Sequence, residues 1–181
     1  GLVPAGVDLG EEQLQLLFDY LNDTPPKFLL VFAGWSSHTS RAISRLVNPT
    51  GRTAFVHDTD TFSTDVEMHH VRYRTKISRD FQRYKDQNLW QELLLALPSE
   101  VWGAKWDVIL VDSPNGCCSN TRLSETHTPG RFQSIYTAKR LARVGTIILV
   151  DDCERDTERE YGLAMLGEEN LVKQVRRQGR G

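Results

Sequence analysis

The chain has 181 residues, of which 39% are hydrophobic and 25% charged, the composition of an ordinary single-domain globular protein. Its 22 basic and 24 acidic side chains leave a formal net charge of −2, so charge gives no support for a nucleic-acid partner or a membrane surface. No stretch approaches the roughly 20 apolar residues that span a bilayer. The sequence begins with Gly1 and shows no signal peptide, so we expect a fragment or mature form without its own anchor.

Hydrophobic patterns predict helices and strands that alternate along the chain. A helix is expected over 11–21, ahead of a core of about 27–175. The further expected elements are a strand at 28–32, a helix at 40–47, strands at 53–56 and 68–73, a helix at 89–97, a strand at 106–112, a helix at 132–142, a strand at 146–151, a helix at 157–166 and the start of a strand at 170–175. This alternation predicts one α/β domain over 1–181, with a doubly wound, mostly parallel sheet.

Two hydrophobic runs, at 106–112 and 146–152, both end in carboxylates: Asp112 after the first, and Asp151 and Asp152 after the second. Continuous Val/Ile/Leu runs are typical of strands buried on both faces of a parallel sheet, where ligands bind outside the carboxyl ends of the strands. Asp112 or Asp152 could act as a general base toward a hydroxyl group. Alternatively, the three acids are candidate ligands for a divalent cation. Loop capping would explain a single acid, but less readily three.

The turn after the first strand predicts close approach of a ligand to the backbone. Ala33 and Gly34 are small, and free N–H groups at a following helix can bind polar groups, although the GxGxxG fingerprint is absent. The second strand ends at Asp58, with Asp60 nearby; an acid there can accept hydrogen bonds from ribose hydroxyls or cap a helix. Turn and acid together favour an adenosine-containing ligand.

Arg131 and the cysteines leave alternatives open. The Arg131 guanidinium suits recognition of a substrate carboxylate, and pairing with a nearby acid is the competing interpretation. Cys117 and Cys118 follow one carboxylate-ended strand and Cys153 follows the other. A disulfide between them requires the two strands to be neighbours, and incidental loop residues are the simpler interpretation.

The sequence resembles the plant glucuronoxylan 4-O-methyltransferase family in an ordered series of segments. The matching segments are 30–32 (LVF), 53–58 (TAFVHD), 71–75 (VRYRT), 106–116 (WDVILVDSPNG), 129–132 (PGRF), 135–138 (IYTA) and 148–152 (ILVDD). They correspond to the family's LVFGLG, TLFLEED, VRYDT, WDLIMIDAPKGY, PGRM, IFSA and FLHDV. The likeness covers about residues 27–161, most of the chain.

The resemblance implies a Rossmann-like methyltransferase that uses S-adenosylmethionine, methylates the 4-hydroxyl of glucuronic acid on xylan and works in the Golgi. It implies that Ala33 and Gly34 line the cofactor, that Asp58 holds the ribose and that Asp112 lies beside the sulfonium. On the acceptor side it implies Arg131 and Tyr136, with Asp152 as the matching acid after the fifth strand.

Departures from the family pattern leave other functions open. The first turn reads GWSSH from Gly34, a His and an Asp stand at 57 and 151, the loop before Pro129 is longer, and the chain is expected to stop before a final strand. The acceptor could therefore be another acidic glycan or a small molecule. A metal-dependent small-molecule O-methyltransferase and a methyltransferase-like binding module without catalysis are the alternatives.

Overall fold

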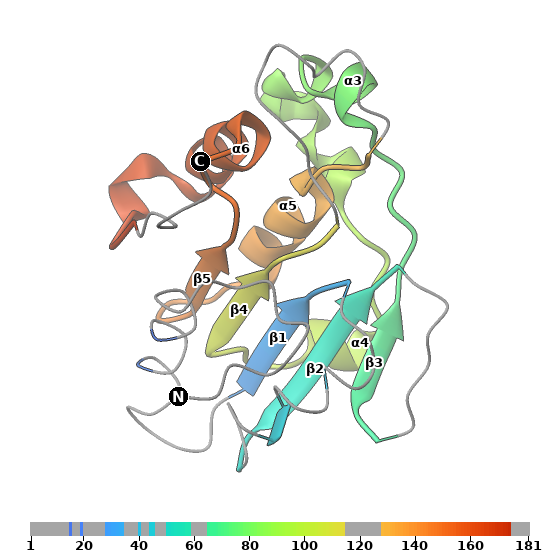
Figure 1. The fold of residues 1–181 in the computed structure, drawn as a ribbon, viewed down its shortest axis with the longest axis vertical. Coiled ribbons are helices and arrows are strands. Elements are labelled where there is room, and N and C mark those ends of the chain that lie inside the picture. The colour runs from blue at the N-terminus through green and yellow to red at the C-terminus, as the bar shows by residue number, and fades with distance from the viewer. Residues whose placement is uncertain are drawn as a thin grey trace, which may run out of the picture.

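The computed structural model describes residues 28–34, 50–58, 65–114 and 128–174, with five isolated residues before position 46. Among the described residues, five parallel strands form one sheet in the order β3-β2-β1-β4-β5. The strands are β1 (Phe28–Phe32), β2 (Arg52–His57), β3 (Glu67–His70), β4 (Val108–Val111) and β5 (Ile147–Val150). Figure 1 shows them side by side, with all their carboxyl ends at the same, upper edge of the sheet. The structure confirms the predicted α/β, Rossmann-like fold.

The central strands are apolar on both faces because both faces are buried. Residues Leu29 to Phe32 of β1 and Ile109 of β4 have no exposed surface. The long helices are α5 (Phe132–Leu141) and α6 (Asp156–Leu166); α5 packs against β4, β5 and α6. Shorter elements complete the described part: α3 (Ile77–Asp80), η1 (Arg83–Lys85), η2 (Gln87–Leu93), α4 (Ser99–Trp102) and η4 (Glu168–Asn170). No helix of the described part is long and apolar enough to cross a bilayer.

The order of the strands places a topological switch point between β1 and β4. Chain order runs from β1 outward through β2 to β3, and then returns to β4 on the other side of β1. In open α/β sheets of this kind, ligands bind in the crevice outside the carboxyl ends at the switch point. The residues that follow β1 and β4 are therefore the first candidates for a ligand-binding site.

Three predicted elements are wrong in type or extent. The helix expected at 89–97 is the 3₁₀ helix η2, which stops at Leu93; beyond it, Leu95 N–H donates to Thr137 Oγ1 on α5 (3.1 Å) instead of continuing a helical ladder. The strand expected at 68–73 ends at His70 as β3. The strand expected at 170–175 is absent from described residues 171–174, which follow η4.

Other predicted segments lie outside the described residues. They are the helices at 11–21 and 40–47, apart from Gln15, Asp19, Ser40, Ser44 and Arg45, the turn 35–38, and the loop residues 115–127.

Candidate active site

The turn after β1 lies directly beside the exit of β4. Ala33 N–H donates to the Val56 carbonyl of β2 (3.1 Å), and Asp112 N–H donates to the Phe32 carbonyl of β1 (2.8 Å). Gly34 is exposed, and a Cβ atom at this position would lie 3.7 Å from Ser113 Oγ. The switch point therefore brings together Gly34 and Asp112, two residues predicted to bind the cofactor, although the binding itself stays a prediction.

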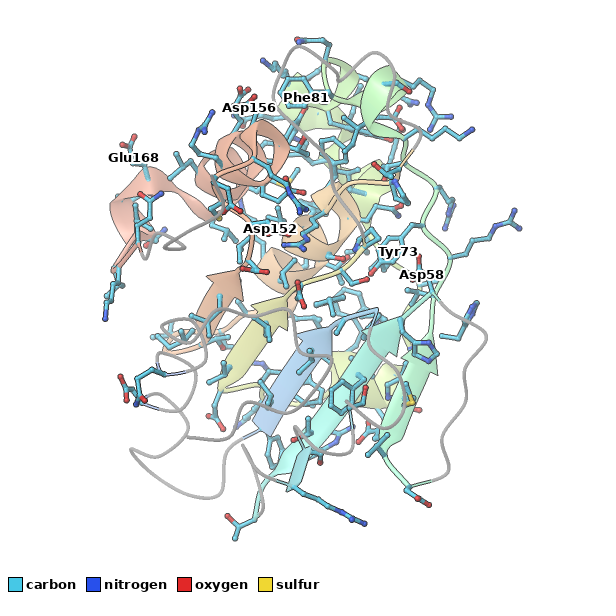
Figure 2. The ribbon with its side chains drawn as sticks, in the orientation of Figure 1. Asp58, Tyr73, Phe81, Asp152, Asp156 and Glu168 are labelled. Carbon is cyan, nitrogen blue, oxygen red and sulfur yellow. The ribbon has the colours of Figure 1, made fainter. Side chains whose placement is uncertain are left out.

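Three carboxylates gather at the carboxyl ends of β4 and β5. One oxygen from each of Asp112, Asp151 and Asp152 lies within 4.8 Å of the other two. All three side chains are largely or fully buried, and Figure 2 shows Asp152 just beyond the end of β5. Asp152 has a φ of +59°, a left-handed conformation that aspartate tolerates better than most residues. The predicted clustering of the acids is present in the structure.

Arg131 lies between these carboxylates and binds both strand exits. Its Nη2 donates to Asp152 Oδ2 (2.7 Å) and to Asp112 Oδ1 and the Asp112 carbonyl (both 3.1 Å). Its Nη1 donates to the Asp151 carbonyl (2.6 Å), and its Nε to the Pro114 carbonyl (3.4 Å). The planar guanidinium fork suits such a set of convergent oxygens. Arg131 therefore fixes the end of β4 relative to the end of β5.

The burial of Arg131 separates the two interpretations that its sequence position left open. Its side chain is 3% exposed. Burial by itself lowers the pKa of Arg131, but the charges of Asp112, Asp152, Glu158 and Asp151 raise it overall, so the group stays cationic. Pairing with nearby acids is thus what the structure shows, in the interior rather than at the surface. Direct contact of Arg131 with a substrate carboxylate stays a prediction.

The other predicted site residues lie in contrasting surroundings. Asp58 is exposed at the end of β2, and Figure 2 shows it close to Tyr73. Tyr136 is 4% exposed and packs in the hydrophobic core, with its ring centroid 6.2 Å from that of Trp90. The ribose contact of Asp58 and the substrate contact of Tyr136 both stay predictions, and the burial of Tyr136 does not favour the second.

A buried carboxylate near Arg131 was not identified from the sequence. Glu158 in α6 has no exposed surface, and neither of its side-chain oxygens has a hydrogen-bond partner among the described residues. Burial raises the pKa of Glu158, and the attraction of Arg131 offsets this only in part. Helical spacing gave a signal, because Glu158 shares a face with Tyr161, Gly162 and Met165.

Cys117, Cys118 and Asp60 lie outside the described residues, and Cys153 lies in the turn after β5. Cys153 Sγ donates to the Val150 carbonyl (3.3 Å), and its thiol is not part of a disulfide. Burial, followed by the charge of Glu158, raises the pKa of Cys153 to about 12, so the thiol is protonated at neutral pH.

Relatives of the chain are plant proteins, several of them named as polysaccharide methyltransferases. Over 179 residues it is 32% identical to Protein IRX15-LIKE of Arabidopsis thaliana, a match that covers 83% of this chain and 53% of the relative. It is 30% identical to Glucuronoxylan 4-O-methyltransferase 2 of the same plant, over 66% of this chain and 48% of the relative. It is 25% identical to Arabinogalactan O-methyltransferase 2, over 92% and 64%.

The chain spans about half the length of several curated relatives that it matches. A family model described as IRX15/IRX15L/GXM matches residues 12–180, nearly the whole sequence. The match includes every residue of the candidate site, from Ala33 to Glu158. The chain therefore belongs to the IRX15/IRX15L/GXM family and is a divergent relative of the glucuronoxylan 4-O-methyltransferases.

Proposed function

We propose that this chain is an S-adenosylmethionine-dependent O-methyltransferase whose acceptor is a hydroxyl group of a uronic-acid-containing polysaccharide, with 4-O-methylation of a glucuronoxylan as the specific reaction. The observation that carries the proposal is the meeting of the Gly34 turn with the Asp112 exit at the switch point. Relatives named as glucuronoxylan and arabinogalactan methyltransferases support a polysaccharide acceptor. The resemblance also supports a Golgi location.

The residues around the switch point fit an adenosine-containing cofactor. Gly34 is exposed and carries no side chain, so a ligand can approach the backbone there. Asp58 offers carboxylate oxygens to ribose hydroxyls, and Asp112 places a negative charge where a sulfonium cation would lie. S-adenosylmethionine supplies an activated methyl group on that sulfonium.

The acid cluster supplies the groups that the acceptor needs. A carboxylate within reach of the acceptor hydroxyl would take its proton while the methyl group passes from the sulfonium to the oxygen and the neutral thioether leaves, a role for Asp112 or Asp152. Asp152 Oδ2 is bound by two arginines, Arg131 and Arg155 (both 2.7 Å), whereas Asp112 Oδ1 is bound by Arg131 at 3.1 Å. We therefore assign the base role to Asp112. Arg131 serves the acceptor side by holding both carboxylates in place.

The test is transfer of a labelled methyl group from S-adenosylmethionine to glucuronoxylan by the Asp112→Asn variant of this chain. Loss of a general base costs about 10²- to 10⁴-fold in rate, so we expect kcat to fall by at least about 100-fold. Asp107→Asn is the matched control, because Asp107 stands at the other end of the same strand, where its Oδ2 accepts from Phe28 N–H (2.8 Å).

Both variants should unfold at temperatures close to that of the wild type. Activity of Asp112→Asn within about twofold of Asp107→Asn would remove Asp112 from the mechanism. Calorimetry with S-adenosylhomocysteine tests the fold-only alternative: if the folded wild-type chain does not bind it, the chain is a binding module rather than an enzyme.

The acid cluster gives specific support to one second function, a metal-dependent O-methyltransferase for a small molecule. Oxygen atoms of Asp112, Asp151 and Asp152 lie close enough to share a hard divalent cation. Arg131 and Arg155 already supply two positive charges there, so a cation would compete with Arg131 for the same oxygens.

Chelator separates the two functions. Under the proposal, transfer to glucuronoxylan is unchanged after exhaustive dialysis against EDTA, because the arginines neutralise the acids without a metal. Activity that falls at least tenfold with EDTA and returns with added Mg²⁺ or Mn²⁺ would favour the metal-dependent enzyme.

A further inference from the structure

The segment after β3 crosses the carboxyl edge of the sheet toward the exit of β4. Val71 N–H still bonds the His57 carbonyl of β2 (2.8 Å). Three residues later Arg74 N–H donates to Gln133 Oε1 of α5 (2.6 Å), and Thr75 Oγ1 donates to the Pro129 carbonyl (2.8 Å). Since β2 and β1 separate β3 from β4, residues 71–75 border the region where the Gly34 turn and Asp58 lie.

The Tyr73 side chain links this segment to α5 and to the exit of β4. Its hydroxyl lies 3.0 Å from Ser134 Oγ, and Ser134 Oγ lies 2.7 Å from the Ser113 carbonyl. A carbonyl only accepts, so the Ser134 hydroxyl donates to Ser113 and the Tyr73 hydroxyl donates to Ser134. The ring is therefore held in one orientation between the end of β3 and the exit of β4.

Tyr73 lies beside Asp58, the residue proposed to bind the ribose. Figure 2 shows the two side chains close together, and the negative charge of Asp58 acts on the phenol. The Tyr73 side chain is half-buried. Burial raises the pKa of Tyr73, so the group remains a neutral hydrogen-bond donor.

We propose that the Tyr73 ring forms one wall of the nucleoside-binding site and contacts the adenosine part of a ligand held by Gly34 and Asp58. The inference rests on the proposed function, because it needs an adenosine-containing cofactor at the switch point. An aromatic ring that is fixed at its hydroxyl presents the same surface to each ligand at little entropic cost. Contact between a nucleobase and an aromatic side chain depends on the ring, so replacing the ring weakens binding.

The test is calorimetric binding of S-adenosylhomocysteine to Tyr73→Ala, Tyr73→Leu and Tyr73→Phe. We expect the Kd to rise about tenfold or more for Tyr73→Ala and for Tyr73→Leu, which fills the space without an aromatic face. Tyr73→Phe keeps the ring and loses its anchor, so its Kd should rise only about threefold. Tyr84→Phe is the matched control for a lost hydroxyl, since Tyr84 bonds Glu92 (3.4 Å) outside the site, and its Kd should not change.

A second ligand locates the contact. 5′-Methylthioadenosine keeps the nucleoside but lacks the amino-acid part, so Tyr73→Leu should weaken both ligands by the same factor. Loss of affinity for S-adenosylhomocysteine alone would overturn the nucleoside contact. If Tyr73→Leu binds both ligands with a Kd within twofold of the wild type, the Tyr73 ring does not contact the nucleoside, and the proposed function still stands. Absence of binding by the folded wild type would overturn both.

Discussion

At the scale of single residues, Arg131 shows how environment decides the role of a side chain. An arginine after a Pro-Gly turn suits a substrate carboxylate as well as an internal ion pair. In the structure it is buried, and its three nitrogens all donate to oxygens of residues 112, 114, 151 and 152. The acids that made the site recognisable in the sequence are thus the partners that hold this arginine.

Glu158 allows a prediction at the same scale about pH and stability. Its pKa in the folded chain is raised above the ordinary value of 4.5, chiefly by burial. The stabilisation of the folded chain by protonated Glu158 is therefore fully present below about pH 4.5. It is lost as the pH rises through the higher pKa of the folded state. We expect Glu158→Gln, which cannot ionise, to be more stable than the wild type at pH 7 and nearly equal to it at pH 4.

Urea unfolding between pH 4 and pH 8 measures this difference. Glu154→Gln, at an exposed position in the turn before α6, is the control and should follow the wild type throughout. A stability difference between Glu158→Gln and the wild type that does not change with pH would show that folding does not raise the pKa of Glu158.

At the scale of elements, the site depends on how the ends of β4 and β5 are joined. The two strands pair in register from Val108 with Ile147 to Val111 with Val150. Beyond the last pair, hydrogen bonds from Arg131 continue the connection to Pro114 on one side and to Asp152 on the other. The start of α5 thus acts as a clamp on the two strand exits.

Because of this clamp, we expect Arg131→Lys to destabilise the fold although it keeps the positive charge. Lysine lacks the planar fork, so several buried oxygens lose their donors and we expect unfolding to become easier by about 2 kcal/mol. Methyl transfer should fall as well, because Asp112 is no longer fixed. Arg131→Met should cost about 3–5 kcal/mol, as it leaves buried carboxylates without their partner.

Arg83→Lys is the matched control for this pair of variants, measured by the same denaturant unfolding. Arg83 pairs with Glu92, but both side chains are more than 40% exposed, so the cost should be at most about 1 kcal/mol. Equal stability of Arg131→Lys and the wild type would mean that the fork geometry is unimportant.

At the scale of the whole molecule, the sheet brings candidate site residues from five distant segments to one edge. The order β3-β2-β1-β4-β5 brings the exits of β1 and β4 together at the switch point, and those of β2 and β5 lie on either side. Gly34 and the side chains of Asp58, Tyr73, Asp112 and Asp152 then border the same region. Under the proposed function, these residues would hold the cofactor at the carboxyl edge of the sheet.

The sequence by itself determined the strands and the acids at their ends. A strand buried on both faces leaves a continuous apolar run, and the residue that ends it lies at the edge where ligands bind. Asp58, Asp112 and Asp152 could therefore be picked out without coordinates. The end of the 3₁₀ helix η2 could not, because just beyond it Leu95 N–H donates to Thr137 Oγ1 on another element.

Only the tertiary structure decided which of these groups meet. Arg131 binds acids 19 and 21 residues away, and Tyr73 reaches Ser134 across 61 residues. Such contacts depend on strand order and on the direction in which each segment leaves the sheet, and neither is encoded in a local hydrophobic pattern. For Glu158 the limit is partial: helical spacing puts it on the same face as Tyr161 and Met165, but its full burial is set by the packing of α6 against α5.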